Sequence, residues 1–415
     1  MLKIPKTSIQ KSKCWFPTTQ RKSLINSNSW FKITKLKNNV TTFVEEKINT
    51  SQIRCKQITL NPKLKERNIL LTWFELYRRA YNTTIKYLRQ KPEKTSFYDV
   101  RKNVKICFKN NLNFSNLIKK NKVYTHTLDN AIKDVIKARK IAFSNLKQKN
   151  INHFRLRYKK KNHHLKTLVL EANTFNIKGL GLKIKMLQDL NPSEIIKTNK
   201  ECRLGYNKRT CKFTLYVPYE KTIKTTLKRS STCSLDPGVR TFQSVYSPDG
   251  YCYEFNDTNN VISKSLERIE KVKLLKQEPW YKKYTERLRE KLKNRVADLH
   301  WKTCNFLCKN FNNILIGNMS TISIVKNQKS VLNDATKRKL YTLSHHLFKL
   351  RLQSKATEYN VKYKEVDESY TSKTCGGCGN LNNSLGSSKI FKCGDCNFSI
   401  DRDVNGARNI YIKHT

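Results

Sequence analysis

The C-terminal stretch Cys375-Gly-Gly-Cys378, Cys393-Gly-Asp-Cys396 and Asp401-Arg-Asp403-Val-Asn405-Gly-Ala-Arg-Asn409 decides the fold of this chain. Two Cys-x2-Cys pairs separated by 14 residues have the ligand type and spacing of a zinc site in which four thiolates surround one ion. No coordination position is left for a substrate, so this zinc is predicted to be structural. Two disulfides are the alternative interpretation of the same cysteines.

The remaining cysteines show no framework spacing, which favours a reducing compartment, cytosol or nucleus, over a secretory one. The N-terminus lacks the apolar core of a signal peptide, and the longest apolar runs, such as Ile69 to Phe74, are far too short to span a bilayer. We therefore expect no membrane association. The scattered thiols are Cys14, Cys55, Cys107, Cys202, Cys211, Cys233, Cys252, Cys304 and Cys308.

The charge balance indicates the partner. The chain carries 84 Lys and Arg against 31 Asp and Glu, a formal net charge of +53 over 415 residues. This excess exceeds what solubility needs and suits contact with several stretches of phosphate backbone. A biased genome that merely fills a solvated surface with Lys is the plainer alternative. Binding to nucleic acid is expected to depend strongly on salt.

The first half divides by pattern. Residues 1–50 are basic and without periodicity, which predicts a flexible arm. Residues 51–230 combine a strand at Gln52 to Leu60, a helical block over about 62–150 and alternating runs between His164 and Glu220. This order predicts a small antiparallel sheet or β-barrel with a helical bundle inserted.

Residues 231–415 have a different pattern, in which short strands alternate with helices. That order predicts an RNase H-like α/β domain with helices on both faces of a mixed sheet, and a zinc ribbon inserted over about 370–399. The expected elements are a strand at 233–246, a turn at 247–250, a strand at 251–255, helices over 262–311 broken near Pro279, a strand at 312–317, a helix at 336–359, a strand at 361–368 and a helix at 403–414 that Asp403 can cap.

Cleavage of a phosphodiester by two Mg²⁺ ions requires carboxylates from distant segments of the chain. Asp236 stands in a strand immediately before Pro-Gly, and Asp403 opens the last helix. A single Asp-Pro-Gly is more often an ordinary turn. Its combination with the cysteine pairs and the terminal Asp-x-Asn-x-Ala-x-Asn segment makes both residues candidates for metal binding.

At this point the motifs resemble a known family. Leu235-Asp236-Pro-Gly-Val-Arg, Thr371-Ser-Lys-Thr-Cys375-Gly-Gly-Cys378-Gly and Asp401-Arg-Asp403-Val-Asn-Gly-Ala-Arg-Asn409 look like the split RuvC nuclease and zinc ribbon of the TnpB proteins and their Fanzor relatives in eukaryotes and viruses. The match is specific over about residues 230–415 and weaker around 58–82.

The resemblance implies an RNA-guided DNA endonuclease with two catalytic Mg²⁺ ions and a structural zinc. It implies a wedge barrel with a helical recognition insertion, a transposon-derived guide RNA, a double-stranded DNA target and a short target-adjacent motif. A monomeric ribonucleoprotein in the nucleus, or in a cytoplasmic viral factory if a virus encodes it, is the corresponding expectation. A catalytically inactive regulator derived from a transposon is the alternative.

One departure from the family pattern concerns the second acid. TnpB proteins place a Glu at the end of the strand that here reads Ile314-Leu-Ile316-Gly317, and glycine has no ligand to offer. Glu368 looks like the relocated glutamate of the Fanzor group. Glu365 is the alternative, and it has the opposite parity on a regular strand. The implied magnesium ligands are Asp236, Glu368 and Asp403, with Asp401 as a neighbouring acid; the remaining possibility is a dead site.

Basic and aromatic residues supply candidate nucleic-acid contacts. On the helix that follows Pro62, Trp73 and Tyr77 are predicted to be core. The run 155–161 suits a backbone contact or an import signal, and a solvated loop fits equally. His345 and His346 are expected to be structural or to contact backbone. The candidate contacts are Arg78, Arg79, Tyr81, Asn82, Lys159, Lys160 and Lys161.

Overall fold

The computed structural model describes residues 21–24, 33–36, 51–93, 96–121, 123–171, 175–176, 179–180, 200–222, 230–326, 332–386 and 388–415. The chain forms two compact units, one of residues 52–221 and one that combines 1–51 with 222–415. No helix within the described ranges has the length and apolarity needed to cross a bilayer.

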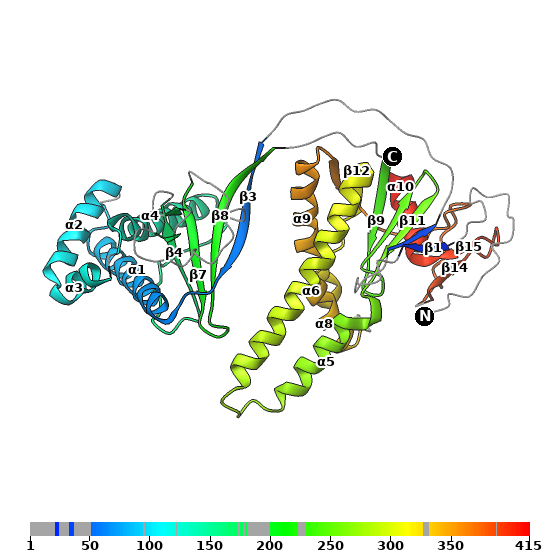
Figure 1. Ribbon diagram of the computed structural model, residues 1–415. Helices are drawn as coiled ribbons and strands as arrows, with labels where there is room; N and C mark the ends of the chain where they lie inside the picture. Colours follow the sequence, from blue (N-terminus) through cyan, green and yellow to red (C-terminus); the bar gives the residue numbers. More distant parts are fainter. Residues whose placement is uncertain are drawn as a thin grey trace. The chain divides into compact units, whose positions relative to one another are not determined.

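The N-terminal unit contains four helices and one sheet, and the first and last of these helices contact the sheet (Figure 1). The sheet has the strand order β3-β8-β7-β4. Its elements are β3 (Ser51–Leu60), α1 (Leu64–Gln90), α2 (Phe97–Asn110), α3 (Leu112–Lys120), α4 (Thr125–Lys147), β4 (Leu165–Leu170), β7 (Cys202–Asn207) and β8 (Lys212–Thr222). The predicted strand, helical block and later strands therefore appear in the expected order.

The core of this unit confirms the helical pattern of α1. Trp73 and Tyr77 are buried, as predicted, and Phe74 packs near Tyr206 and Phe213 of the sheet. The described strands form an open sheet and do not close a barrel. The hairpin of β5 (Phe175–Asn176) and β6 (Gly179–Leu180) is separate from that sheet, and the run Leu182 to Met186 lies outside the described residues.

The C-terminal unit is built on a seven-stranded sheet of order β1-β2-β11-β10-β9-β12-β13. Strands β9, β10 and β11 are antiparallel, whereas β12 runs parallel to both β9 and β13. The strands are β1 (Arg21–Leu24), β2 (Ile33–Leu36), β9 (Ser230–Pro237), β10 (Gln243–Ser247), β11 (Tyr251–Phe255), β12 (Phe311–Gly317) and β13 (Lys362–Val366). The parallel pairs bring the carboxyl ends of β9, β12 and β13 to one edge.

Two features of this sheet differ from the sequence-based prediction. The segment 233–246 is two strands, because Pro237 and Gly238 end β9 and the Gly238 N–H bonds to the Phe242 carbonyl at 3.3 Å. Strands β1 and β2 lie inside the segment predicted to be a flexible arm, and β2 pairs with β11. Without β2, the backbone N–H and C=O groups along this edge of β11 would lack strand partners, and such an edge favours pairing with a further strand.

The predicted helices of this unit appear in the expected order with one division, and the short helix at Thr321–Lys326 was not predicted. They are α5 (Val261–Lys273), α6 (Tyr281–Asn310), α7 (Thr321–Lys326), α8 (Asp334–Leu343), α9 (His345–Glu358) and α10 (Arg402–His414), with a short 3-10 turn at Thr258–Asn260. The break near Pro279 is confirmed. The single helix predicted at 336–359 is two helices, because Ser344 has a left-handed backbone (φ 50).

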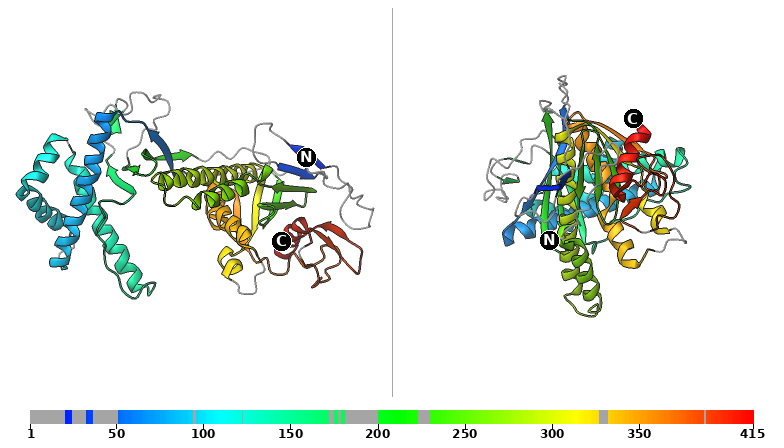
Figure 2. Two further views of the ribbon diagram at one scale, coloured as in Figure 1. Left: turned by 90° about the horizontal axis from the view of Figure 1, so that it is seen from below. Right: turned by 90° about the vertical axis from the view of Figure 1, so that its right-hand side faces the viewer.

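The central strands carry α10 on one face and the long helices on the other (Figures 1 and 2), and alternate side chains face opposite ways. Ile314 and Ile316 of β12 belong to the large core beneath α5, α6 and α9. Leu315, between them, packs with Val366 and with Ile410 of α10. The period of two along a strand thus separates a helical face from the face that carries α10.

Candidate active site

Three acidic residues reach one edge of the sheet from separate strands and a helix. Asp236 lies one residue before the end of β9, and Ile316 pairs with the preceding Leu235 in the parallel register. Gly317 ends β12 and pairs with Val366, the last residue of β13. Glu368 follows two residues later and therefore returns to the same face as Val366.

The Glu368 carboxyl group fills the space that a side chain at position 317 would take. A Cβ built on Gly317 would collide with Oε2 of Glu368 and lie 3.2 Å from its Cδ. Glycine at 317 and glutamate at 368 are therefore sterically matched. The arrangement places a carboxylate at the end of β12 although β12 itself supplies none.

Asp236 and Glu368 sit in an environment that disfavours negative charge. Burial, followed by the nearby Glu368 and Asp403, raises the pKa of Asp236 well above its usual range. Burial raises the pKa of Glu368 to about 7. The nearby cations Arg402 and Lys349 oppose these shifts without cancelling them. Acids held close together bind a divalent cation readily, because the ion removes their mutual repulsion.

The two aspartates at the start of α10 have different tasks. Asp401 caps the helix, since its Oδ1 accepts hydrogen bonds from the backbone N–H of Asp403 at 3.0 Å and of Val404 at 3.5 Å. Its other oxygen lies 3.5 Å from Lys389. The expectation that Asp403 caps this helix was therefore wrong. Asp403 accepts a hydrogen bond from the Thr241 hydroxyl instead, and burial raises its pKa.

The acids beside Glu368 point elsewhere. Glu365 has the opposite parity and lies on the α9 side, where Lys349 Nζ contacts it at 2.8 Å and the Tyr363 hydroxyl donates at 2.9 Å. Asp367 pairs with Lys413 at 2.6 Å. Both carboxylates are thus compensated by other partners. The alternation of side chains along a strand predicted that Glu365 and Glu368 face opposite sides of the sheet, and they do so in the structure.

The carboxylate set fits a divalent cation on one direct observation. Oε2 of Glu368 is buried and has no hydrogen-bond partner, which costs free energy unless an ion or water meets it. The ligand atoms of the three acids are spaced more widely than those of a compact one-ion site. Among the described residues, the four cysteines are the group in which three or more ligand atoms lie within 4.8 Å of one another.

The cysteines form that compact cluster. The Sγ atoms of Cys375 and Cys396 are 3.6 Å apart, as are those of Cys378 and Cys393. This spacing is too long for a disulfide and suits thiolates around one tetrahedral ion. The described part of the ribbon contains the short pair β14 (Ile390–Lys392) and β15 (Ser399–Asp401) and an isolated bridge between Thr374 and Leu381. The cysteine cluster thus supports the predicted structural zinc.

Helix α10 couples the zinc ribbon to the acids. Asn409 donates from Nδ2 to the carbonyls of Thr371 and Thr374 at 2.8 and 2.7 Å, and Asn405 donates to Thr374 at 2.7 Å. The Gly376 N–H in turn donates to Asn405 at 3.1 Å. The two asparagines of the terminal motif therefore fix the backbone between Glu368 and the first cysteine pair.

Replacing Asn409 with Ala is expected to destabilise the C-terminal unit by about 1–3 kcal/mol, because the Thr371 carbonyl loses a buried donor, while the Thr374 carbonyl keeps Asn405. Thermal unfolding at saturating zinc measures this change. Asn310→Ala is the matched control, since its amide is exposed and bonds only within α6. An equal loss of stability in both variants would contradict the assigned role of Asn409.

Two residues that lie far from Asp236 in the sequence pack beside it in the fold. Gly406 allows α10 to approach, since a Cβ there would collide with Oδ2 of Asp236 and lie 3.1 Å from its Cγ. His345 is buried beside the loop that follows Asp236, with Nδ1 3.4 Å from Nε2 of Gln243. Burial lowers the pKa of His345 to about 4. The structural role expected for this histidine fits that position.

The predicted nucleic-acid contacts of the N-terminal unit divide into two groups. Arg78 and Arg79 pair with Glu75 at 2.6 and 3.1 Å. Asn82 bonds to the backbone of Lys159, whose side chain lies over Tyr81. Lys160 and Lys161 remain exposed. Several of these residues therefore already have intramolecular partners.

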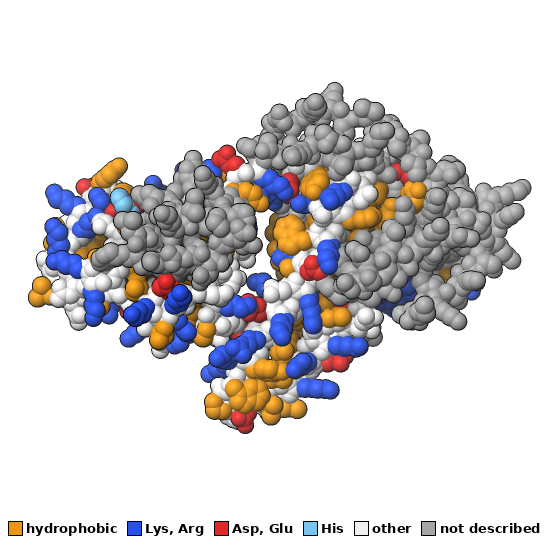
Figure 3. All heavy atoms as spheres, viewed as in Figure 1, with side chains coloured by type: hydrophobic (Ala, Val, Ile, Leu, Met, Phe, Trp, Pro, Cys, Tyr) orange, Lys and Arg blue, Asp and Glu red, His pale blue; other side chains and the backbone are white. Residues whose placement is uncertain are grey.

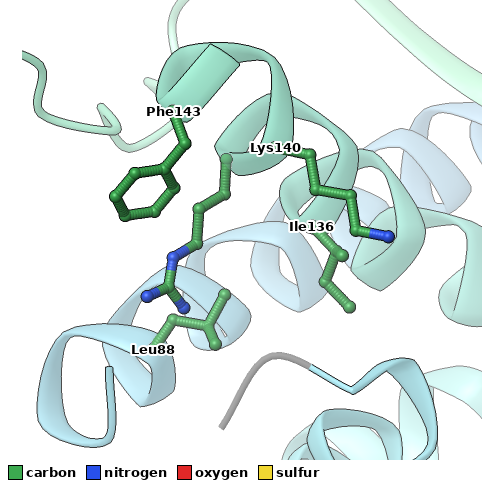
Figure 4. A pocket seen from close by; sticks show the side chains of 5 residues that line it. Leu88, Ile136, Lys140 and Phe143 are labelled. Carbon is green, nitrogen blue, oxygen red and sulfur yellow. The ribbon is translucent and has the colours of Figure 1, made fainter. Parts of the chain in front are cut away.

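A shallow hollow between α1 and α4 lies near this region (Figure 4). Its lining consists of Leu88, Ile136, Arg139, Lys140 and Phe143. It contains no carboxylate, thiol or hydroxyl group. The sheet edge of the C-terminal unit, where the acids gather, is therefore the candidate site.

Comparison with known proteins identifies the family. Residues 345–410 match the family described as Cas12f1-like, TNB domain. A TnpB-like protein of Acanthamoeba polyphaga mimivirus is 31% identical over 386 residues, which cover 86% of this chain and 72% of the relative. A CRISPR-associated endodeoxyribonuclease Cas12f1 of Sulfoacidibacillus thermotolerans is 35% identical over 83 residues, 20% of this chain and 19% of that protein.

Two further comparisons concern a second viral relative and a solved structure. A putative transposase of the same mimivirus is 31% identical over 454 residues, 96% of this chain and 90% of the relative. A solved Cas12f1–sgRNA–target DNA complex aligns over 86% of this chain and 98% of that chain with a TM-score of 0.32 and 16% identity, a likeness too low to carry weight. On the extent of the viral matches, and as the sequence motifs predicted, this chain belongs to the TnpB-like transposase family.

Proposed function

We propose that this protein is an RNA-guided DNA endonuclease whose RuvC-type, RNase H-like domain cleaves DNA with two Mg²⁺ ions held by Asp236, Glu368 and Asp403. The observation that carries the proposal is the placement of Glu368 over Gly317, with an unpartnered carboxylate oxygen next to Asp236. The sheet order, three antiparallel strands followed by two parallel ones, supports the RNase H-like assignment.

In this proposal each residue of the site has a separate task. The bound ions would activate water and stabilise the leaving oxygen. Asp236, one residue before the end of β9, lies close enough to both other acids to raise the pKa of its own carboxyl group, and would be a ligand together with them. The Thr241 hydroxyl orients Asp403, and the asparagines of α10 keep the chain after Glu368 in place. A looser spacing than that of the cysteines suits two ions about 3.5–4 Å apart.

The proposal extends to the partners. The relatives include Cas12f1 proteins named as endodeoxyribonucleases, and the net charge of +53 suits an RNA guide together with a DNA duplex. Lys and Arg side chains predominate over acidic ones on the face shown in Figure 3. We assign the N-terminal unit to the predicted wedge and recognition roles, and the assembly to a nuclear or viral-factory ribonucleoprotein.

Cleavage of a matched plasmid by protein purified with its RNA tests the proposal. Wild-type protein is expected to cut with Mg²⁺ and not with EDTA, and Glu368→Ala is expected to lose cutting. The double variant Gly317→Glu with Glu368→Ala should recover part of the activity, because the new side chain starts where the old one ended. Glu365→Ala, one face away, is the control and should cut normally. Cutting by Glu368→Ala at the wild-type rate would remove Glu368 from the site.

A second candidate function follows from Gly317. Because β12 ends without a carboxylate, the alternative is a transposon-derived regulator. Such a protein would still bind RNA and DNA but would not cleave the DNA. Sequencing of copurified RNA and a nicking assay separate the two. Specific copurified RNA without nicking in Mg²⁺ or Mn²⁺ would favour the regulator.

A further inference from the structure

Residues 155–161, called the basic strap from here on, have no regular secondary structure, yet α1 fixes their backbone. Asn82 accepts a hydrogen bond from the Lys159 N–H at 2.8 Å and donates to the Lys159 carbonyl at 3.1 Å. Arg89 donates to the Leu156 carbonyl at 2.7 Å. A loop held at both its N–H and C=O groups by a helix is a fixed part of the protein surface.

The side chain of Lys159 points into the unit. Its Nζ lies 4.1 Å from the centroid of the Tyr81 ring and 5.0 Å from that of Tyr77. Arg89 stacks over Tyr158 at 4.4 Å. These cation–π contacts add to the backbone bonds. Lys159 is therefore an anchor of the strap and is not available to a ligand.

The other cations of the strap face solvent. Arg155, Arg157, Lys160 and Lys161 are exposed, and none of them has an ion pair with an acid in the described part of the chain. Some cations of the same unit are compensated, as Arg101 is by Asp129 at 2.9 Å. The strap thus concentrates four uncompensated positive charges on a fixed backbone.

We propose that the basic strap binds the phosphate backbone of a nucleic acid, with its four exposed cations as the phosphate contacts and α1 as the support that holds them in place. The inference rests on the nucleic-acid chemistry proposed above but not on cleavage. Because the strap is ordered beforehand, little conformational entropy is lost on binding. If the strap acted instead as an import signal that is bound as a free peptide, it would first have to break its hydrogen bonds to Asn82 and Arg89.

The salt dependence of binding tests the proposal in the full, zinc-loaded chain. The variant changes all four exposed cations to Gln, and the probes are a random-sequence single-stranded RNA and a DNA duplex of equal length. Each phosphate contact adds about 0.7 to the slope of log K against log salt for a single strand and about 0.9 for B-DNA. Loss of four contacts is therefore expected to reduce the slope by about 3, with the larger change on the probe that the strap contacts.

The matched control makes the same change of net charge on another surface of the same unit. It replaces Lys102, Lys109, Lys119 and Lys120 of α2 and α3, which are also exposed, with Gln, and its slope should change by less than about 1. Equal changes in the two variants, or an unchanged slope in the strap variant, would overturn the proposal. A wild-type protein that binds neither probe would overturn this proposal and the proposed function together.

Asn82→Ala tests the support without changing charge. We expect it to weaken binding about fivefold through the cost of ordering the strap, while the slope stays near that of the wild type. Wild-type affinity in this variant would show that a fixed backbone is not needed. If Asn82→Ala does not fold, the four-residue variant, whose positions are all exposed, still decides the matter.

Discussion

Replacing Glu368 with Gln is expected to lower Mg²⁺-dependent cleavage by about 10³-fold or more and, without divalent ions at pH 8, to make the protein more stable. The loss of activity follows because a missing carboxylate removes several kcal/mol of stabilisation by the ions. The gain in stability follows because Glu368 is buried beside Asp236, so that its ionisation costs free energy in the folded state. One substitution therefore acts in opposite directions on activity and stability.

The pH dependence of this effect has a definite sign. Burial raises the pKa of Glu368 from the ordinary value of 4.5 to about 7, so the folded protein holds its proton more tightly than the unfolded chain does. The resulting cost is absent below pH 4.5, grows as the pH rises and is complete above about 7. Glu368→Gln should thus gain up to about 3 kcal/mol, or about 6–12 °C in melting temperature, at pH 8 and nothing at pH 4.

Calorimetry in EDTA at the two pH values measures this difference, and added Mg²⁺ should stabilise the wild type more than the variant. Glu365→Gln is the control, because Glu365 is exposed and paired with Lys349. Its loss should be neutral or destabilising by less than about 1 kcal/mol. A Glu368→Gln protein that is no more stable than the wild type at pH 8 would contradict the crowding of acids described above.

Removing the zinc is expected to unfold the ribbon and to lower cleavage by about 100-fold or more even in excess Mg²⁺. The ribbon has a very small apolar core, in which Leu385, Phe391 and Phe398 pack around the cysteines, and its only sheet is a short two-stranded pair. Such a hairpin is barely stable in water by itself. A structural zinc supplies about 10–16 kcal/mol of apparent binding free energy, so the ion provides most of the stability of this segment.

The expected loss of cleavage follows from chain connectivity. Glu368 precedes the first cysteine by seven residues and Asp403 follows the last by seven, so both acids leave a segment that the zinc organises. A displacement of about 1 Å at a catalytic group can cost 10²-fold in rate. Cys378→Ser tests this directly, with zinc content, protease cleavage between residues 373 and 396, and plasmid cutting as the three measurements.

Cys107→Ser is the matched control, since this exposed thiol of α2 lies outside the cluster. It should leave zinc content and cutting unchanged. If Cys378→Ser lost its zinc but still cut at the wild-type rate, the acids would have to be held without the ribbon.

The sequence by itself determined much of this protein because many of its signals are local. Cysteine spacing, the Asp-Pro-Gly break and the apolar period of α1 are each read within a few residues, and the zinc cluster, the end of β9 and the buried Trp73 and Tyr77 all agree with them. Family motifs of the same local kind led to the TnpB-like assignment. Strand parity even separated Glu365 from Glu368 before any tertiary contact was known.

Only the tertiary structure decided how the acids meet. The parallel register of β12 with β13 sets Gly317 beside Val366, and this register lets Glu368 occupy the space above the glycine. In the packed structure Asp401 caps the N-terminus of α10, and Asp403 accepts a hydrogen bond from Thr241. Packing of the strap on α1 likewise gave Asn82 an internal role that its sequence context did not show. These outcomes depend on contacts between residues far apart in the chain, and local sequence patterns carry no information about such contacts.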